Sequence, residues 1–96
     1  MKIRILPSAI ADLDQGRRFY EAQAAGVGRY FLDTLISDID SLAIYAGIHL
    51  QVFGYHRLLS KRFPYAVYYR LENDTCLIFR VLDCRQSPPK TTQALR

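Results

Sequence analysis

Residues 62–70 of the chain read RFPYAVYYR and residues 75–82 read TCLIFRVL, with Asn73-Asp74 between the two stretches. Both stretches are rich in aromatic and β-branched residues. A short Asn/Asp turn that joins two such stretches is typical of an antiparallel β-hairpin. Pro64 fits at the start of the first strand, because proline has no backbone N–H to donate to a neighbouring strand. We therefore expect this hairpin to be the centre of the fold.

Upstream of the hairpin, the sequence predicts a strand followed by a pair of helices. Residues 3–6 form a short apolar strand, and Ser8 is the expected N-cap of a helix over residues 9–25, with Asp12 near the positive end of the helix dipole. The glycine-rich residues 26–28 are too short for anything except a tight connection between helices. These features predict a helical hairpin.

The second helix of this pair has the clearest pattern in the chain. Between residues 29 and 45, apolar residues recur at helical spacing, at Phe31, Leu35, Ile39 and Leu42. Gly47 can end the helix, residues 48–54 form a connection that is expected to be partly extended, and residues 55–59 form a further strand.

The element order is therefore β-α-α-β-β-β, which predicts an α+β domain with a helical hairpin packed on an antiparallel sheet of three to four strands. The domain is expected to span residues 1–86. Residues 87–96 begin with two prolines and are expected to form a flexible tail. The residues expected to be largely buried are Leu13, Tyr20, Phe31, Leu35, Ile39, Leu42, Val67 and Phe79.

Both faces of the predicted hairpin are apolar. Strand alternation places Val67 and Tyr69 on one face and Ala66 and Tyr68 on the other, and in the second strand it sets residues 77, 79 and 81 against residues 78 and 82. One helical pair covers only one face of such a sheet. The other face implies a partner chain, a curled sheet or self-association, of which we favour a partner.

Charge is divided unevenly along the 96 residues. Residues 1–48 carry five basic and six acidic side chains, whereas residues 49–96 carry eight basic and three acidic ones. A basic half suggests an anionic partner, either nucleic acid or an acidic protein segment. The alternative is a strand edge that Lys and Arg keep soluble.

The two cysteines and two histidines predict no metal site. Cys76 and Cys84 are expected on one strand, on the same face and too far apart for a disulfide, as reduced core residues. No close Cys/His spacing suggests zinc, and no cofactor is expected. The chain has neither a signal-peptide pattern nor a run of about 20 apolar residues, so we expect a cytoplasmic protein that does not enter a membrane.

No motif of high specificity for an enzyme is present, since the sequence contains no phosphate-binding glycine loop and no HExxH pattern. What remains is a set of cations around the predicted sheet. Such a set could hold phosphates and stabilise developing charge during RNA cleavage. Its members are His56, Arg57, Lys61, Arg62, Arg70, Arg80 and Arg85.

The order of elements, Arg57, the stretch over residues 62–70 and the stretch RVLDCR over residues 80–85 together resemble the ParE/RelE superfamily of small toxins, also called plasmid-stabilisation proteins. The resemblance spans almost the whole chain, and its most specific part is the FPY-x-V-Y-Y segment. It implies the toxin of a type II toxin-antitoxin system. Such a toxin is neutralised by a cognate antitoxin whose flexible segment wraps around it.

The two branches of this superfamily differ in target. The resemblance to the ParE branch implies a poison of DNA gyrase, whereas a RelE-like protein would cleave messenger RNA on the ribosome with Lys, Arg and Tyr or His side chains. A third possibility is a binding module without catalytic activity. The chain is an enzyme only in the second case.

The end of the last strand favours the ParE branch. Many members of the superfamily have a His there, followed two residues later by paired arginines, but this chain has Asp83-Cys84-Arg85-Gln86. An acid/base group is therefore missing, and Asp83 would repel a phosphate. We expect Arg57, Arg62 and Arg85 to contact the target. The nuclease alternative would need a substitute from His56, Lys61, Tyr68, Arg70 and Arg80.

Overall fold

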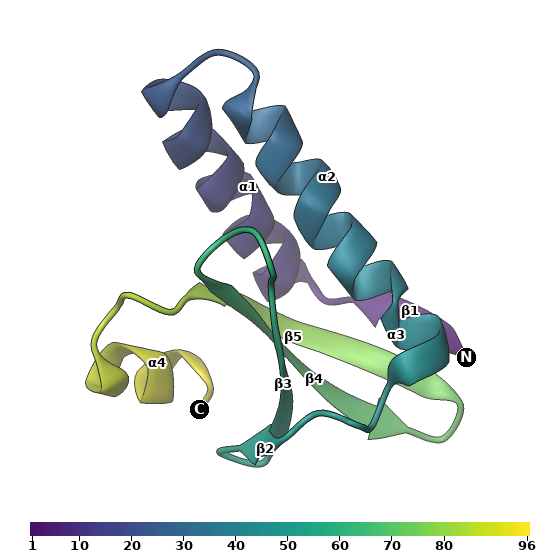
Figure 1. The fold of residues 1–96 in the computed structure, drawn as a ribbon. Coiled ribbons are helices and arrows are strands. Elements are labelled where there is room, and N and C mark those ends of the chain that lie inside the picture. The colour runs from purple at the N-terminus through teal and green to yellow at the C-terminus, as the bar shows by residue number, and fades with distance from the viewer.

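The computed structural model describes residues 1–96 and contains five strands and four helices (Figure 1). Their bounds are β1 Lys2–Ile5, α1 Pro7–Gln23, α2 Val27–Asp40, α3 Leu42–Tyr45, β2 Gln51–Val52, β3 Tyr55–Leu59, β4 Tyr65–Glu72, β5 Thr75–Asp83 and α4 Pro88–Ala94. The α+β class and the helical hairpin are as the sequence predicts. Figure 1 shows α1 and α2 together on one side of the sheet and α4 on the other.

The sheet has the order β1-β5-β4-β3-β2. It is larger than the predicted three to four strands, because the connection after α3 contributes the two-residue strand β2. It is also mixed. β1 runs parallel to β5, whereas all other neighbours are antiparallel. The pairing of the first strand with the last could not be read from local sequence, since it joins residues more than 70 positions apart.

The central hairpin is confirmed, with a left-handed backbone at Asn73 in its turn (φ 56°). An irregularity in the hairpin changes the predicted faces. Tyr68 pairs with Arg80 and Tyr69 pairs with Ile78, so Phe79 is an extra residue in a β-bulge. Ile78 and Val81 consequently both belong to the core beneath the helices. The expectation that Val81 and Ile78 lie on opposite faces is wrong for this reason.

The first face of the sheet, which is the face beneath α1 and α2, carries the main core. The predicted residues Phe31, Leu35, Ile39 and Leu42 are at most 1% exposed, and they pack with Leu13 and Val67. Gly16 lies against Phe31, and a Cβ there would come within 2.5 Å of the Phe31 ring. The glycine that weakens α1 thus lets the two helices approach closely. The predicted core residues Tyr20 and Phe79 are only half-buried.

The start of α1 differs from the prediction, whereas the tight connection after its end is as predicted. The helix begins at Pro7, and no side chain caps it. Ser8 is therefore not an N-cap, and its hydroxyl instead donates to the carbonyl of Phe79 at 2.7 Å, which ties the helix to β5. At the far end, Gly26 is left-handed (φ 88°), as a tight connection requires. The Glu21 carboxylate accepts hydrogen bonds from the backbone of Gly26 and Gly28.

The second face of the sheet, opposite the helical hairpin, has a smaller cluster made of Tyr55, Ala66, Tyr68, Leu82 and Leu95. Leu95 follows α4 and is 7% exposed. The tail expected to be flexible is thus a short helix docked on this face. Prolines exclude a central strand but suit the first turn of a helix, because their missing N–H is unpaired there in any case.

The cysteines differ from one another. Cys76 is a buried core residue with a free thiol, as expected, but Cys84 lies beyond β5 and is exposed. The strand ends at Asp83, one residue too early to bury it.

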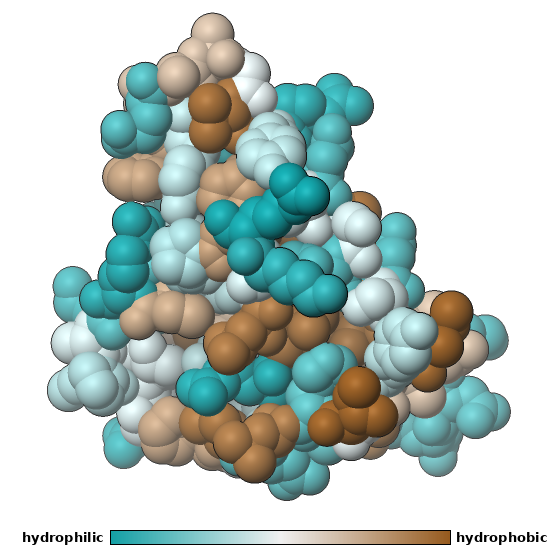
Figure 2. Space-filling view, viewed as in Figure 1, coloured by the Kyte–Doolittle hydropathy of each residue, from teal (hydrophilic) through white to brown (hydrophobic).

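Apolar side chains also remain on the surface between α3 and β3. Ile48, Leu50 and Phe53 are more than half exposed. Figure 2 shows apolar side chains gathered over the lower half of the molecule, below the helical hairpin. No helix has both the length and the apolar character needed to cross a bilayer.

Candidate functional site

The second face of the sheet brings three of the predicted site residues into one row. Strand pairing sets Arg57 of β3 beside Tyr68 of β4, and Tyr68 beside Arg80 of β5. Alternation along β4 adds Arg70 to the same face, next to Tyr55 and Phe79. The face therefore carries three arginines among three aromatic rings, which is the arrangement that the spacing of these residues along their strands produces.

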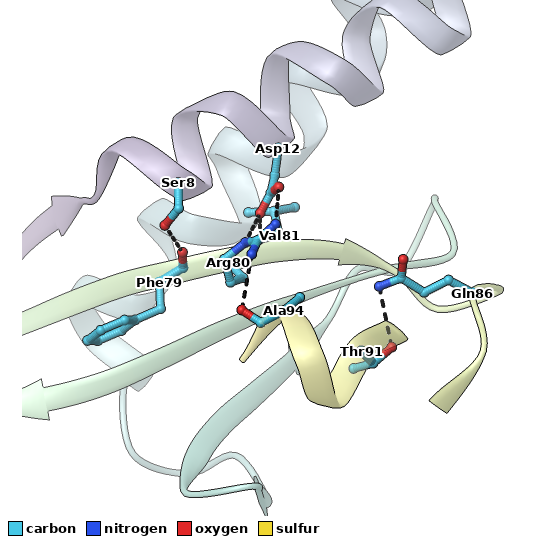
Figure 3. Close-up of polar contacts among 8 residues, drawn as sticks. All are labelled: Ser8, Asp12, Phe79, Arg80, Val81, Gln86, Thr91 and Ala94. Atoms are coloured by element: carbon cyan, nitrogen blue, oxygen red, sulfur yellow. Dashed lines mark hydrogen bonds and ion pairs between the residues drawn. The ribbon is translucent and has the colours of Figure 1, made fainter. Parts of the chain in front are cut away.

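Arg80 is held by the first helix and is not free to contact a ligand. Its guanidinium donates to both carboxylate oxygens of Asp12, at 2.7 and 2.8 Å, and to the carbonyl of Ala94 at 3.0 Å (Figure 3). The backbone N–H of Val81 donates to the same carboxylate at 2.9 Å. The bond to Asp12 raises the pKa of Arg80 further above its ordinary value. This pair joins α1, β5 and the end of α4.

Asp12 is the partner of a predicted site residue that sequence reasoning missed. It looks like a helix-start acid, but its carboxylate is only 9% exposed and faces β5. Its partner is 68 residues away. The one signal in the sequence is its position beside the apolar stripe of the helix, next to Leu13, where a charged side chain needs a buried partner.

Arg70 is occupied by aromatic rings. Its guanidinium lies 4.1 Å from the ring centroid of Tyr55 and 5.4 Å from that of Phe79. It also donates to the carbonyl of Gly54 at 3.2 Å. This cation–π packing fixes the tight turn between β2 and β3 and explains why an arginine follows the aromatic run of β4.

Arg85 lies at the end of β5, and Asp83 neutralises it. The two side chains form a bidentate pair with contacts of 2.8 and 2.9 Å. The pair lowers the pKa of Asp83 and raises that of Arg85, chiefly through these hydrogen bonds. The guanidinium also lies 5.9 Å from the ring centroid of Phe19 on α1. Asp83 thus forms an ion pair with Arg85, which is the cation that a phosphate would need at this position.

Arg62 and Lys61 lie apart from this row. Arg62 donates to the hydroxyl of Tyr30 on α2 at 2.7 Å, so it belongs to the side of the helical hairpin. Lys61 is exposed in the loop before β4. The structure therefore does not bring Arg62 together with Arg57, although the sequence had suggested both as target contacts.

His56 lies on the first face of the sheet, away from the arginines. It stacks on Tyr69 with ring centroids 5.0 Å apart, and its Nδ1 contacts the carbonyl of His49 at 2.8 Å. His49 in turn contacts the Tyr69 hydroxyl, and burial lowers the pKa of His49. These contacts are structural, since they close the connection after α3 over Tyr69.

The remaining polar group on the second face is the Tyr68 hydroxyl. Burial is the main cause of a raised pKa for this side chain, although the neighbouring Arg57 opposes the shift. The hydroxyl therefore stays protonated at neutral pH, and it accepts a hydrogen bond from the Arg57 side chain. A general base is absent beside it, and no group of three His, Cys, Asp or Glu side chains could hold a metal ion.

Comparison with known proteins shows the family from the sequence and the fold from a solved structure. The sequence model described as "ParE toxin of type II toxin-antitoxin system, parDE" matches residues 3–88. Among solved structures, a chain from the chromosomal ParDE toxin-antitoxin system of P. aeruginosa is similar, with a TM-score of 0.77 and 21% identity. The match covers 84% of the present chain and 92% of that one. No curated protein sequence matches.

Proposed function

Since the chain belongs to the ParE toxin family of type II toxin-antitoxin systems, we propose that it poisons DNA gyrase. Gyrase poisoning is the activity that the resemblance to the ParE branch implies. The alternative within the superfamily is cleavage of ribosome-bound messenger RNA. Both targets lie in the cytoplasm, and we place the toxin there.

We choose gyrase over messenger RNA for one reason. The side chains that a nuclease would need already have partners within the chain. Phosphodiester cleavage requires an acid/base pair and a phosphate clamp in mutual register. Arg80 is paired with Asp12, Arg70 is stacked on Tyr55, and His56 lies on the opposite face of the sheet. Tyr68 is left without a base. Of the three arginines on this face, Arg57 is the one that neither pairs with a carboxylate nor lies over an aromatic ring.

Poisoning of a protein target makes a weaker demand, because it needs only a complementary surface. The second face and the end of β5 supply such a surface, with Arg57 and Arg85 at its margins. A paired arginine such as Arg85 can still contact a protein through the edge of its ion pair, since its side chain is about half exposed. Arg62 lies in the β3–β4 connection and would contact the target from the side of the helical hairpin, where it donates to Tyr30.

The deciding experiment runs two assays side by side on the purified protein. One measures supercoiling by gyrase, and the other measures cleavage of ribosome-bound messenger RNA. The wild type should inhibit supercoiling and leave the messenger RNA intact, and Arg85→Ala should weaken the inhibition. Site-specific cleavage of messenger RNA with unaffected gyrase would establish the nuclease, and inactivity in both assays would leave a binding module.

The family also supplies a partner, because the toxin of a toxin-antitoxin system is paired with an antitoxin. We propose that the antitoxin contributes an acidic or amphipathic segment that folds on binding and covers the exposed apolar surface between α3 and β3. Ile48 and Leu50 are 74% and 73% exposed there, and the C-terminal half of the chain is basic. An amphipathic acidic segment matches both properties.

Co-expression with the neighbouring open reading frame tests this partner. The neighbour should restore growth and co-purify with the toxin, and Ile48→Asp should reduce the amount that co-purifies. Ile10→Asp is the matched control, because Ile10 is also more than half exposed but lies on α1. A toxin that is harmless alone and has no binding neighbour would contradict the proposal.

A further inference from the structure

Arg57 is the one arginine of the second face whose charge is not used within the chain. Arg80 pairs with Asp12, and Arg70 lies over the ring of Tyr55, but Arg57 forms no ion pair. The neighbouring Tyr68 hydroxyl accepts a hydrogen bond from Arg57 but is uncharged, so it supplies no counter-ion. A half-buried guanidinium without a counter-ion is costly to keep, which suggests a ligand that supplies the missing negative charge.

Arg57 opens into a small cavity of about 190 Å³. The polar side chains that line it, besides Arg57 itself, are the Tyr68 hydroxyl, the Gln86 amide and the Thr91 hydroxyl, together with the Cys84 thiol. No carboxylate lines this cavity. A pocket that has a cation and several donors but no anionic group suits an oxyanion.

Helix α4 builds one wall of the cavity. Pro88 and Thr91 come from this helix, and the Gln86 amide, which precedes the helix, donates to the Thr91 hydroxyl oxygen at 3.3 Å. The match to the ParE family ends at residue 88, so nearly all of α4 lies outside the matched region. The other wall is the exposed aromatic ring of Phe53.

We propose that the cavity between Arg57 and α4 is a binding site for a single carboxylate, namely an acidic side chain of a protein partner. One guanidinium balances one carboxylate, and the planar fork of arginine matches the two oxygens. A nucleic-acid strand would need a run of free cations, and the other arginines of this face are engaged. Phe53 and Pro88 give the rim an apolar character that suits a protein chain beside the acidic group. The site does not depend on which target the toxin poisons.

The test is a titration of the full-length protein with sodium acetate, followed by the backbone amide signals of Arg57, Tyr68 and Thr91 in NMR spectra. Sodium chloride at matched ionic strength is the control, and sodium phosphate is the comparison. We expect saturable shifts of these signals with acetate and none with chloride. Shifts that simply follow ionic strength, or binding of phosphate in preference to acetate, would overturn the proposal.

Two variants localise the effect. Thr91→Glu places a carboxylate on the α4 wall, where it can pair with Arg57 and should abolish the acetate-dependent shifts. Gln93→Glu makes the same change in charge on the exposed side of α4 and should leave the shifts intact. Both positions are on the surface of a short helix, so neither change should unfold the domain. Acetate binding that survives Thr91→Glu, or that Gln93→Glu removes equally, would place the ligand elsewhere.

Discussion

The two faces of the sheet are built from the same strands but are used differently. The first face buries a continuous set of apolar and aromatic side chains beneath two long helices, and its polar groups bond to one another. The second face carries arginines among aromatic rings and is covered only in part, by a seven-residue helix. The first face therefore accounts for stability. We propose that the second face is left for contacts with other molecules.

The first face should give the largest loss of stability. Leu35 is fully buried between α2 and the sheet, so Leu35→Ala is expected to lower the free energy of unfolding by roughly 2–5 kcal/mol. Denaturant titration measures the change. Leu50→Ala, at a position that is mostly exposed, is the control and should be nearly neutral. Unchanged stability in Leu35→Ala would remove the second helix from the core.

The contact that links the two faces should rank second. Asp12→Asn keeps the shape of the side chain but leaves Arg80 without its carboxylate, and we expect a loss of about 1–3 kcal/mol. Asp14→Asn is the matched control, because Asp14 makes more exposed ion pairs with Arg17 and Arg18 on the same helix and should matter much less. Equal effects of the two changes on thermal unfolding would show that the buried pair of Asp12 and Arg80 stabilises the fold no more than the exposed pairs of Asp14.

Loosening the contact of α4 with the sheet should have a smaller effect than the first two changes, and the effect should be confined to α4. No residue within the helix is buried, and Leu95 provides most of its apolar contact. Leu95→Ala is expected to speed hydrogen exchange of the α4 amides about tenfold while the core amides stay protected, because about 1.5 kcal/mol of burial is lost there. Gln93→Ala should change neither. If exchange accelerated across the whole chain instead, α4 would be part of the main cooperative unit.

The smallest expected effect is the pH dependence at the end of β5. Arg85 holds the pKa of Asp83 below its ordinary value, so the pair stabilises the fold above the pKa of the unfolded Asp, about 3.9, and this contribution is lost as the pH falls through the lowered pKa of the folded state. Thermal unfolding of the wild type and Asp83→Asn, followed from neutral to acidic pH, should differ slightly near neutrality and converge in acid. A constant difference at all pH values would exclude the ion pair as the cause.

The sequence predicts the first face well and the second face poorly, for a physical reason. Helical spacing in α2 and the aromatic run of β4 are local patterns, and burial follows from them directly. The pairing of β1 with β5 and the contact between Asp12 and Arg80 depend on residues about 70 positions apart, and the bulge at Phe79 breaks the simple alternation of the hairpin. No local pattern encodes such contacts.

The candidate site shows the same division. The cations of the site are visible as residue types, but which of them remain available is decided by tertiary partners. Arg80 and Arg85 look alike in the sequence, yet one is tied to a helix and the other to its neighbour two residues away. Pro88-Pro89 excludes a strand and so favours a flexible tail, but Leu95 is an apolar residue in this segment that allows it to dock.

The most direct test of the division between the faces is gyrase supercoiling measured with Arg57→Ala and Arg29→Ala. Both changes remove one positive charge, but Arg57 lies on the second face, whereas Arg29 is an exposed residue of α2 paired with Asp33. With both variants folded to the wild-type melting temperature, Arg57→Ala should lose inhibition of supercoiling and Arg29→Ala should keep it. Full inhibition by Arg57→Ala would contradict the assignment of the second face as the surface through which this toxin acts.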